Sequence, residues 1–144
     1  SLQKLGHICL LNGNYEEALS YLHKALKISQ EMEKPFHAEI AETLHLIGLA
    51  YSKSGRHQEA LNAHQKVLKI RTGIFGESNH QVGTTLYYIA AEYLKLEDFA
   101  KAEEFSKRAL DIYLKNYGDS HKSVPKIKQL YNLSAKLSSH NKKQ

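Results

Sequence analysis

The sequence predicts an all-α solenoid of three helix–turn–helix repeats followed by one capping helix. Two observations carry this prediction: an internal repeat of 42 residues, and apolar residues spaced three and four positions apart within each copy. The composition agrees with a folded domain, because 42% of the 144 residues are hydrophobic and 24% are charged.

The repeat becomes visible when three segments of the chain are aligned without a gap. They begin at Leu2, Leu44 and Leu86, so each copy starts 42 residues after the previous one. A unit that recurs in this way buries its apolar face against its neighbours. Four columns hold the same residue in all three copies: Leu2/Leu44/Leu86, Ala18/Ala60/Ala102, Leu26/Leu68/Leu110 and Ile28/Ile70/Ile112.

Each copy contains two apolar stripes with helical spacing. In the second copy Leu44, Ile47, Gly48 and Tyr51 follow the i, i+3, i+4, i+7 pattern, and a second stripe begins at Ala60. The two stripes predict a pair of antiparallel helices. Small residues recur where the paired helices should approach closely, at Gly6/Gly48/Ala90 and Ala18/Ala60/Ala102.

The segment NGNYEEAL, residues 12–19, is predicted to form the bend between the paired helices of the first copy. An Asn-Gly dipeptide indicates a β-hairpin only when alternating strands flank it, and here helical stripes flank it. Gly13 is expected to end the first helix in the left-handed conformation. Asn14 is expected to cap the second helix, with Glu17 completing a capping box.

These patterns predict a single domain over residues 1–138. Its repeats should cover about residues 1–34, 35–76 and 77–118. A capping helix is expected over about 123–138, with Ser123 as N-cap and Pro125 in the first turn, and a flexible tail over 139–144. The first copy begins inside its first helix, so we expect a fragment of a longer protein.

The repeats resemble the tetratricopeptide repeat. The pattern of that family is matched in the second copy by Leu44, Ile47, Gly48, Tyr51, Ala60 and Val67. The length of 42 residues and the connector residues Gly118, His121 and Val124 are similar to the kinesin light chain type of this repeat. The resemblance implies a right-handed superhelix whose inner wall is lined by the first helix of each pair.

The inner wall can be located by advancing about 100° per residue from the buried stripe. Lys53 and Lys95 lie at equivalent positions on it, and several of its residues are apolar, which is typical of a contact site. We therefore expect a partner segment with apolar or aromatic and acidic residues, although the protein's own flanking sequence is an alternative occupant. The predicted groove residues are Gln3, His7, Leu10, Leu11, Glu42, His45, Leu49, Ser52, Lys53, Thr84, Tyr87, Ala91, Leu94 and Lys95.

The sequence thus predicts a non-catalytic scaffold or adaptor that binds another protein. Two alternatives stay open: a peptide-sensing or regulatory domain attached to an effector outside this chain, and structural self-assembly. The sequence does not determine the oligomeric state.

Catalytic, metal, nucleic-acid and membrane functions are not predicted. The nine histidines include no i, i+4 pair with a neighbouring Glu, and Cys9 is the only cysteine, so we expect no enzyme activity, metal or cofactor. The net charge of +5 is modest and acidic residues interleave with the basic ones, so no nucleic-acid partner is expected. No apolar run approaches the roughly 18 residues that span a membrane, and a single cysteine agrees with a cytoplasmic location.

Overall fold

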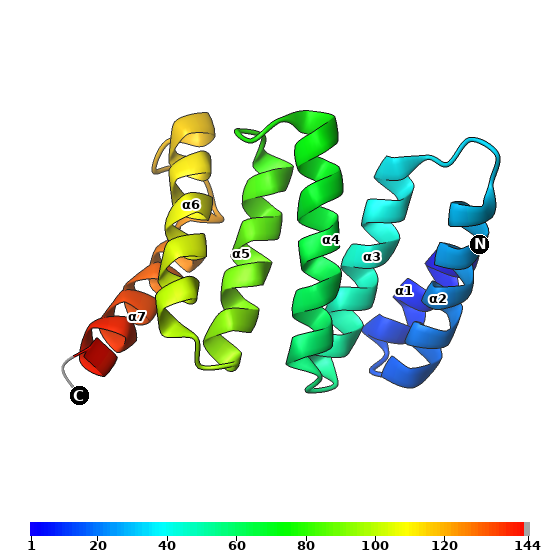
Figure 1. The fold of residues 1–144 in the computed structure, drawn as a ribbon, viewed down its shortest axis with the longest axis horizontal. Coiled ribbons are helices and arrows are strands. Elements are labelled where there is room, and N and C mark those ends of the chain that lie inside the picture. Colours follow the sequence, from blue (N-terminus) through cyan, green and yellow to red (C-terminus); the bar gives the residue numbers. More distant parts are fainter. Residues whose placement is uncertain (143–144) are drawn as a thin grey trace. The chain divides into compact units, whose positions relative to one another are not determined.

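The computed structural model describes residues 1–142, and within that range all regular structure is α-helical (Figure 1). The predicted all-α fold is therefore confirmed. The chain divides into two compact units, Ser1–Ile74 and Phe75–Gln144, which are described separately below. The helices of the described range are α1 (Leu2–Leu11), α2 (Tyr15–Glu31), α3 (His37–Lys53), α4 (His57–Phe75), α5 (His80–Lys95), α6 (Phe99–Tyr117) and α7 (Val124–Lys142).

The first unit is built from α1 to α4. Helix α2 packs against both α1 and α3, and α1 also contacts α3. Helix α4 lies against α3, where the ring of His64 meets Gly48. The apolar core of this unit is continuous over the four helices and consists of Leu10, Ala18, Leu19, Leu22, Ile40, Ala41, Leu44, Leu46, Ile47, Ala50, Ala63 and Val67.

In the second unit, α6 packs between α5 and α7, and α5 also contacts α7. Val124 and Ile127 of α7 are both 1% exposed. They follow Val82 and Thr85 of α5 by 42 residues, and those two residues are buried as well. Helix α7 therefore packs as the first helix of a fourth copy would. It continues to Lys142, so residues 139–142 of the expected tail are helical, and residues 143–144 lie outside the described range.

The bends within the helix pairs occupy equivalent positions. Gly13 and Gly55 have φ angles of 82° and 85°, which confirms the left-handed residue predicted at Gly13, and Glu97 adopts a φ of 63° in the third copy. The predicted capping box is wrong, because the Asn14 side chain makes no capping hydrogen bond. The carboxylate of Glu17, the other member of the predicted box, instead accepts a hydrogen bond from the thiol of Cys9, at 3.9 Å between Sγ and Oε2.

Two glycines allow the paired helices of the first unit to touch. A Cβ atom at Gly48 would lie 2.6 Å from Cε1 of His64, and one at Gly6 would lie 2.6 Å from Cγ of Leu22. His64 and Leu22 are both completely buried, so neither can move into solvent. The predicted close approach at these small residues is therefore confirmed.

Replacing Gly48 by valine should destabilise the first unit. We expect Gly48→Val to lower the free energy of unfolding by about 2 kcal/mol, because the added carbons would overlap the buried ring of His64. Urea unfolding followed by circular dichroism measures the change. Gly73→Ala is the matched control: no atom lies within 4 Å of a Cβ there, so this change should stabilise α4 by about 0.5 kcal/mol. Equal stabilities for Gly48→Val and the wild type would contradict this account of the packing.

A pair of histidines is enclosed where α3 meets α4. The rings of His45 and His64 have centroids 5.6 Å apart, and Arg71 of α4 is 7% exposed. Burial, with a smaller effect of the Arg71 charge, lowers the pKa of His45 to about 4. Burial, with smaller effects of His45 and Arg71, lowers the pKa of His64 to about 3. Both imidazoles are therefore neutral in the folded protein at pH 7.

This pair should make the protein sensitive to acid. Below a pH of about 6.5 the unfolded chain protonates both histidines, whereas the folded chain does not until about pH 4 for His45 and about pH 3 for His64. The free energy of unfolding should then fall with decreasing pH by about 1.4 kcal/mol per pH unit for each histidine. Urea unfolding at pH 7.5, 5.5 and 4.5 measures this slope.

Two variants separate the pair from other acid-sensitive groups. His64→Leu should reduce the slope between pH 6.5 and 4.5, because one of the two buried imidazoles is gone. His7→Gln removes an exposed histidine and should leave the slope unchanged. An unchanged slope in His64→Leu would show that the buried pair does not control the response to acid.

Candidate functional site

The first helices of the pairs carry the predicted groove residues, on α1 and α3 in the first unit and on α5 in the second. In the first unit His7, Leu11 and Lys53 are exposed, with Leu11 at 74%. Leu49 and Ser52 are half-buried. In the second unit Lys95 is exposed, and four residues of α5 are half-buried: Thr84, Tyr87, Ala91 and Leu94.

Leu10 was expected on the exposed arc, and the structure instead places it in the core at 5% exposure. The reason lies in the helix geometry. Leu10 follows Gly6 by one turn, so it lies on the side of α1 that packs against α2. Leu10 is therefore part of the fold and is not available to a partner.

Three predicted groove residues form hydrogen bonds within the fold. The Gln3 side chain donates to Oγ1 of Thr43 at 2.9 Å, which links α1 to α3. Arg71 donates to Oε2 of Glu42 at 3.2 Å, and the hydroxyls of Thr84 and Tyr113 share a hydrogen bond. The last two pairs are equivalent under the 42-residue repeat. Each of these two hydrogen bonds connects the start of the first helix of a pair to the end of the second helix.

The outer side of α1 exposes more apolar surface than the sequence indicates. Leu5 is 44% exposed and Ile8 is 54% exposed. The equivalents of Leu5 in the later copies, Ile47 and Ile89, are only 2% and 0% exposed. No helix of the described residues packs on that side of α1 as α2 packs on α3. The residue type at position 5 therefore could not indicate that Leu5 is exposed, because the exposed fraction depends on whether a neighbouring helix covers that side.

In the second unit, α7 adds a residue that sequence reasoning missed. The ammonium of Lys126 lies 5.2 Å from the ring centroid of Tyr87 on α5, which is the geometry of a cation–π contact. The ring of Tyr87 also meets Tyr88 edge-on, with centroids 5.5 Å apart. Lys126 follows Thr84 by 42 residues, and that register could have identified it. The face of α5 therefore has a lysine near Tyr87 as well as Lys95 beside Leu94.

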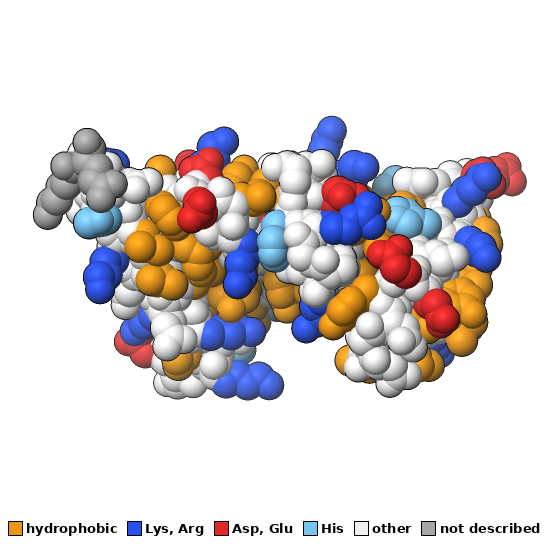
Figure 2. Space-filling view, turned by 90° about the horizontal axis from the view of Figure 1, so that it is seen from below, with side chains coloured by type: hydrophobic (Ala, Val, Ile, Leu, Met, Phe, Trp, Pro, Cys, Tyr) orange, Lys and Arg blue, Asp and Glu red, His pale blue; other side chains and the backbone are white. Residues whose placement is uncertain are grey.

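The lysines on these faces carry positive charge that the fold does not neutralise. Lys53, Lys95 and Lys126 belong to none of the ion pairs formed by the described residues. Figure 2 shows one face of the molecule, on which orange hydrophobic side chains are exposed among blue lysine and arginine and red acidic side chains. Apolar contact area next to free cations suits an acidic segment with apolar side chains.

The described residues contain no group of three or more His, Cys, Asp or Glu side chains that could hold a metal ion. None of their helices is long and apolar enough to cross a membrane.

Comparison with solved structures shows the same fold in longer proteins. BtubC (BKLC) from P. vanneervenii is 24% identical, with a TM-score of 0.80 over 96% of this chain and 54% of its own. RapI in its apo form is 21% identical, with a TM-score of 0.84 over 97% of this chain and 49% of its own. Putative kinesin light chain repeats from Podospora anserina are 18% identical, with a TM-score of 0.84 over 96% and 65%. The chain thus spans about half to two thirds of the length of these proteins.

Comparison of sequences identifies the repeat. No curated protein sequence matches the chain significantly. The model of the tetratricopeptide repeat matches twice, over residues 1–73 and 39–115, which together cover more than half of the chain. The predicted resemblance is thereby confirmed, and the chain belongs to the tetratricopeptide repeat family, with repeats like those of kinesin light chains.

Proposed function

We propose that the chain is a non-catalytic protein-binding module that holds an acidic, apolar segment of a partner on its first helices. Each unit carries its own surface of this kind. In the first unit it consists of His7 and Leu11 on α1 with Leu49 and Lys53 on α3. In the second unit it is formed by Tyr87, Ala91, Leu94 and Lys95 of α5 with Lys126 of α7.

One observation carries this proposal: an aromatic side chain and unpaired lysines meet on the face of α5. Tyr87 supplies a rigid apolar surface, Lys126 lies over its ring, and Lys95 follows about two turns further along α5. Tyr87 and Lys95 are eight residues apart on one helix, or about 12 Å along its axis. An acidic residue on each side of an apolar anchor would match that spacing.

The energetics favour recognition by a preformed surface. Helices α5, α6 and α7 pack together without a partner, so the binding face needs no ordering when a segment arrives. Contact with Tyr87 and Leu94 would supply affinity, and the lysines would select against segments that carry positive charge.

A peptide array tests the proposal. The wild type and the variant Lys53→Glu/Lys95→Glu/Tyr87→Ala are applied to the same set of peptides, and the affinity of each positive peptide is then measured by fluorescence anisotropy. We expect acidic peptides with apolar residues to be enriched, and the variant to bind them at least about tenfold more weakly, since each charge-assisted contact contributes more than about 1 kcal/mol.

Lys24→Glu/Lys27→Glu is the charge-matched control. These two lysines are exposed on α2, away from the first helices, and their reversal should leave the affinities within about twofold. Circular dichroism checks that every variant is folded. If the triple variant is folded and keeps every peptide at wild-type affinity, the first helices are not the binding surface.

A further inference from the structure

A cleft lies between α2 and α4 in the first unit, with α3 as its floor. It consists of two adjoining pockets of about 350 and 210 Å³ that share Leu44 and Lys66. The larger pocket is lined by Gln30, Pro35, His37, Ile40, Leu44, Lys66, Lys69 and Ile70. The smaller is lined by His23, Leu26, Leu44, Ile47, Tyr51, Glu59, Asn62, Ala63 and Lys66. We call these two pockets together the α2–α4 cleft.

The α2–α4 cleft is long enough for a short peptide segment. Its floor runs from Ile40 to Tyr51 on α3, which is about 16 Å along the helix axis. An extended chain covers that length with about five residues. Leu44 in the floor and Lys53 on the first-helix face are about 180° apart around α3. The cleft is therefore a different surface from the one proposed above, and it does not depend on that proposal.

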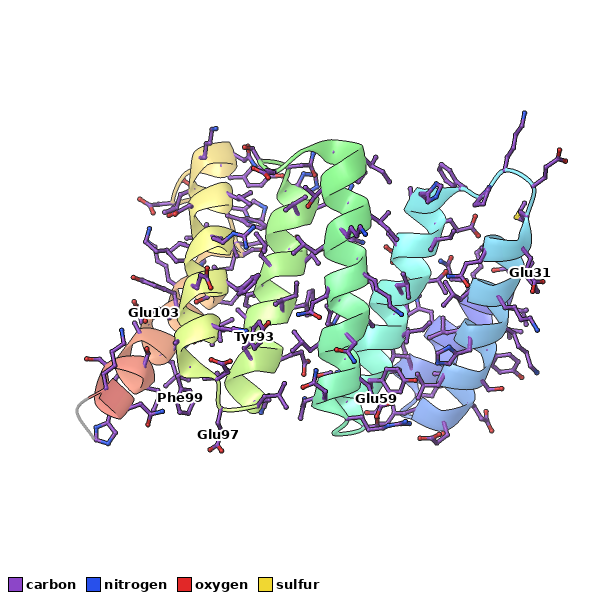
Figure 3. The ribbon with its side chains drawn as sticks, in the orientation of Figure 1. Glu31, Glu59, Tyr93, Glu97, Phe99 and Glu103 are labelled. Carbon is purple, nitrogen blue, oxygen red and sulfur yellow. The ribbon has the colours of Figure 1, made fainter. Side chains whose placement is uncertain are left out.

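One small residue explains why the smaller pocket is open. In the third copy, Tyr93 (labelled in Figure 3) packs against Phe105, with ring centroids 5.4 Å apart. The equivalent pair in the second copy is Tyr51 and Ala63. The methyl group of Ala63 leaves unfilled the volume that a phenyl ring occupies in the third copy. The smaller pocket is lined by both Tyr51 and Ala63.

The charge of the cleft is unbalanced. Lys66 and Lys69 line the larger pocket, and neither belongs to an ion pair of the described residues. Glu59, labelled in Figure 3, lines the smaller pocket, but Arg56 already holds its carboxylate through hydrogen bonds of 2.9 and 2.6 Å. Glu31, at the end of α2 in Figure 3, lines neither pocket. The charge available to a partner is therefore that of the two lysines.

We propose that the α2–α4 cleft is a second protein-binding surface, which takes a short partner segment with two apolar side chains and flanking acidic residues. One apolar side chain would lie against the half-buried Pro35 and Ile70, above the core residues Ile40 and Leu44, and the second in the space beside Leu26 and Ala63. A carboxylate next to the first would pair with Lys66 and Lys69. Phe36, between the lining residues Pro35 and His37, is 66% exposed and offers further apolar contact near that end.

The spacing of the two pockets determines a suitable probe. Their centres are separated by about seven residues of α3, or about 10 Å, which is close to one three-residue turn of a polyproline II chain, where residues i and i+3 face the same side. The probe is a fluorescein-labelled peptide of nine residues with Leu at position 3, Phe at position 6 and Glu at all other positions. A second peptide with Gln in place of Glu tests the charge.

Fluorescence anisotropy with the whole chain tests the proposal. We expect saturable binding of the Glu peptide, at least tenfold weaker binding to Lys66→Glu/Lys69→Glu, and weaker binding of the Gln peptide to the wild type. Ala63→Phe fills the smaller pocket with the side chain found in the third copy, and should weaken binding at least fivefold. The lysine variant keeps the test valid if Ala63→Phe fails to fold, because both lysines are exposed.

Two further variants identify the surface that binds the probe. Lys115→Glu/Lys122→Glu changes the net charge by the same amount on the second unit and should leave binding unchanged, because both lysines are exposed and neither lines the cleft. Lys53→Glu/Lys95→Glu should also leave it unchanged. Loss of binding in Lys53→Glu/Lys95→Glu alone would overturn the cleft and support the first-helix surface. Equal loss in all three double variants would indicate nonspecific attraction to positive charge and would also overturn the proposal.

A second copy of the chain is the competing occupant. The turn formed by Leu96, Glu97, Asp98 and Phe99 carries acidic and apolar residues, and Leu96 is 38% exposed. Sedimentation velocity over a hundredfold range of concentration separates the two cases. We expect no association that depends on the cleft. Association that Lys66→Glu/Lys69→Glu abolishes would show that another copy occupies the cleft, and would overturn the assignment to a partner.

Discussion

The contact between the two helices of a pair is the constraint on which the first unit depends. At Gly48 the backbone of α3 meets the ring of His64 directly, because no Cβ atom separates them. That approach lets α4 bury His64 and Val67 completely. The same contact limits which residues of α3 can meet another molecule. The side of α3 that faces α4 is covered, so only the residues on the two neighbouring sides of the helix remain accessible. Leu49 and Lys53 lie on one of these sides, and the α2–α4 cleft opens along the other.

Much of this fold could be predicted because equivalent positions in the repeat have equivalent surroundings. The left-handed residue recurs at Gly13, Gly55 and Glu97, and Val124 of α7 is buried like Val82 of α5. The equivalence ends where the surroundings differ between copies. Leu5 occupies the same column as the buried Ile47, yet it is exposed because no described helix covers it. A repeat in the sequence identifies the side of a helix that is apolar, and the neighbouring helix decides whether that side is buried.

The candidate site was predictable only in part, for a related reason. Helical periodicity placed Lys53 and Lys95 on exposed arcs, and both are exposed. It could not reveal that Arg71 bonds to Glu42 or that Tyr113 bonds to Thr84, because those contacts depend on how the second helix is aligned with the first. The α2–α4 cleft was invisible for another reason: alanine at position 63 fits a buried helix face, and only packing shows that space remains beside it.

The third copy shows what the α2–α4 cleft would be without a binding role. At the positions equivalent to Ala63, Lys66 and Lys69 it has Phe105, Arg108 and Asp111. Phe105 packs on Tyr93, the guanidinium of Arg108 lies 5.1 Å from the ring centroid of Phe105, and Asp111 pairs with Lys107 at 3.3 Å. Every one of those side chains is used within its own unit, whereas the second copy has a void and two unpaired lysines at the same places. The second and third copies form the same helix pair, so they differ here only in the side chains at three equivalent positions. Variation at these positions can give one repeat a binding surface while the next repeat remains purely structural.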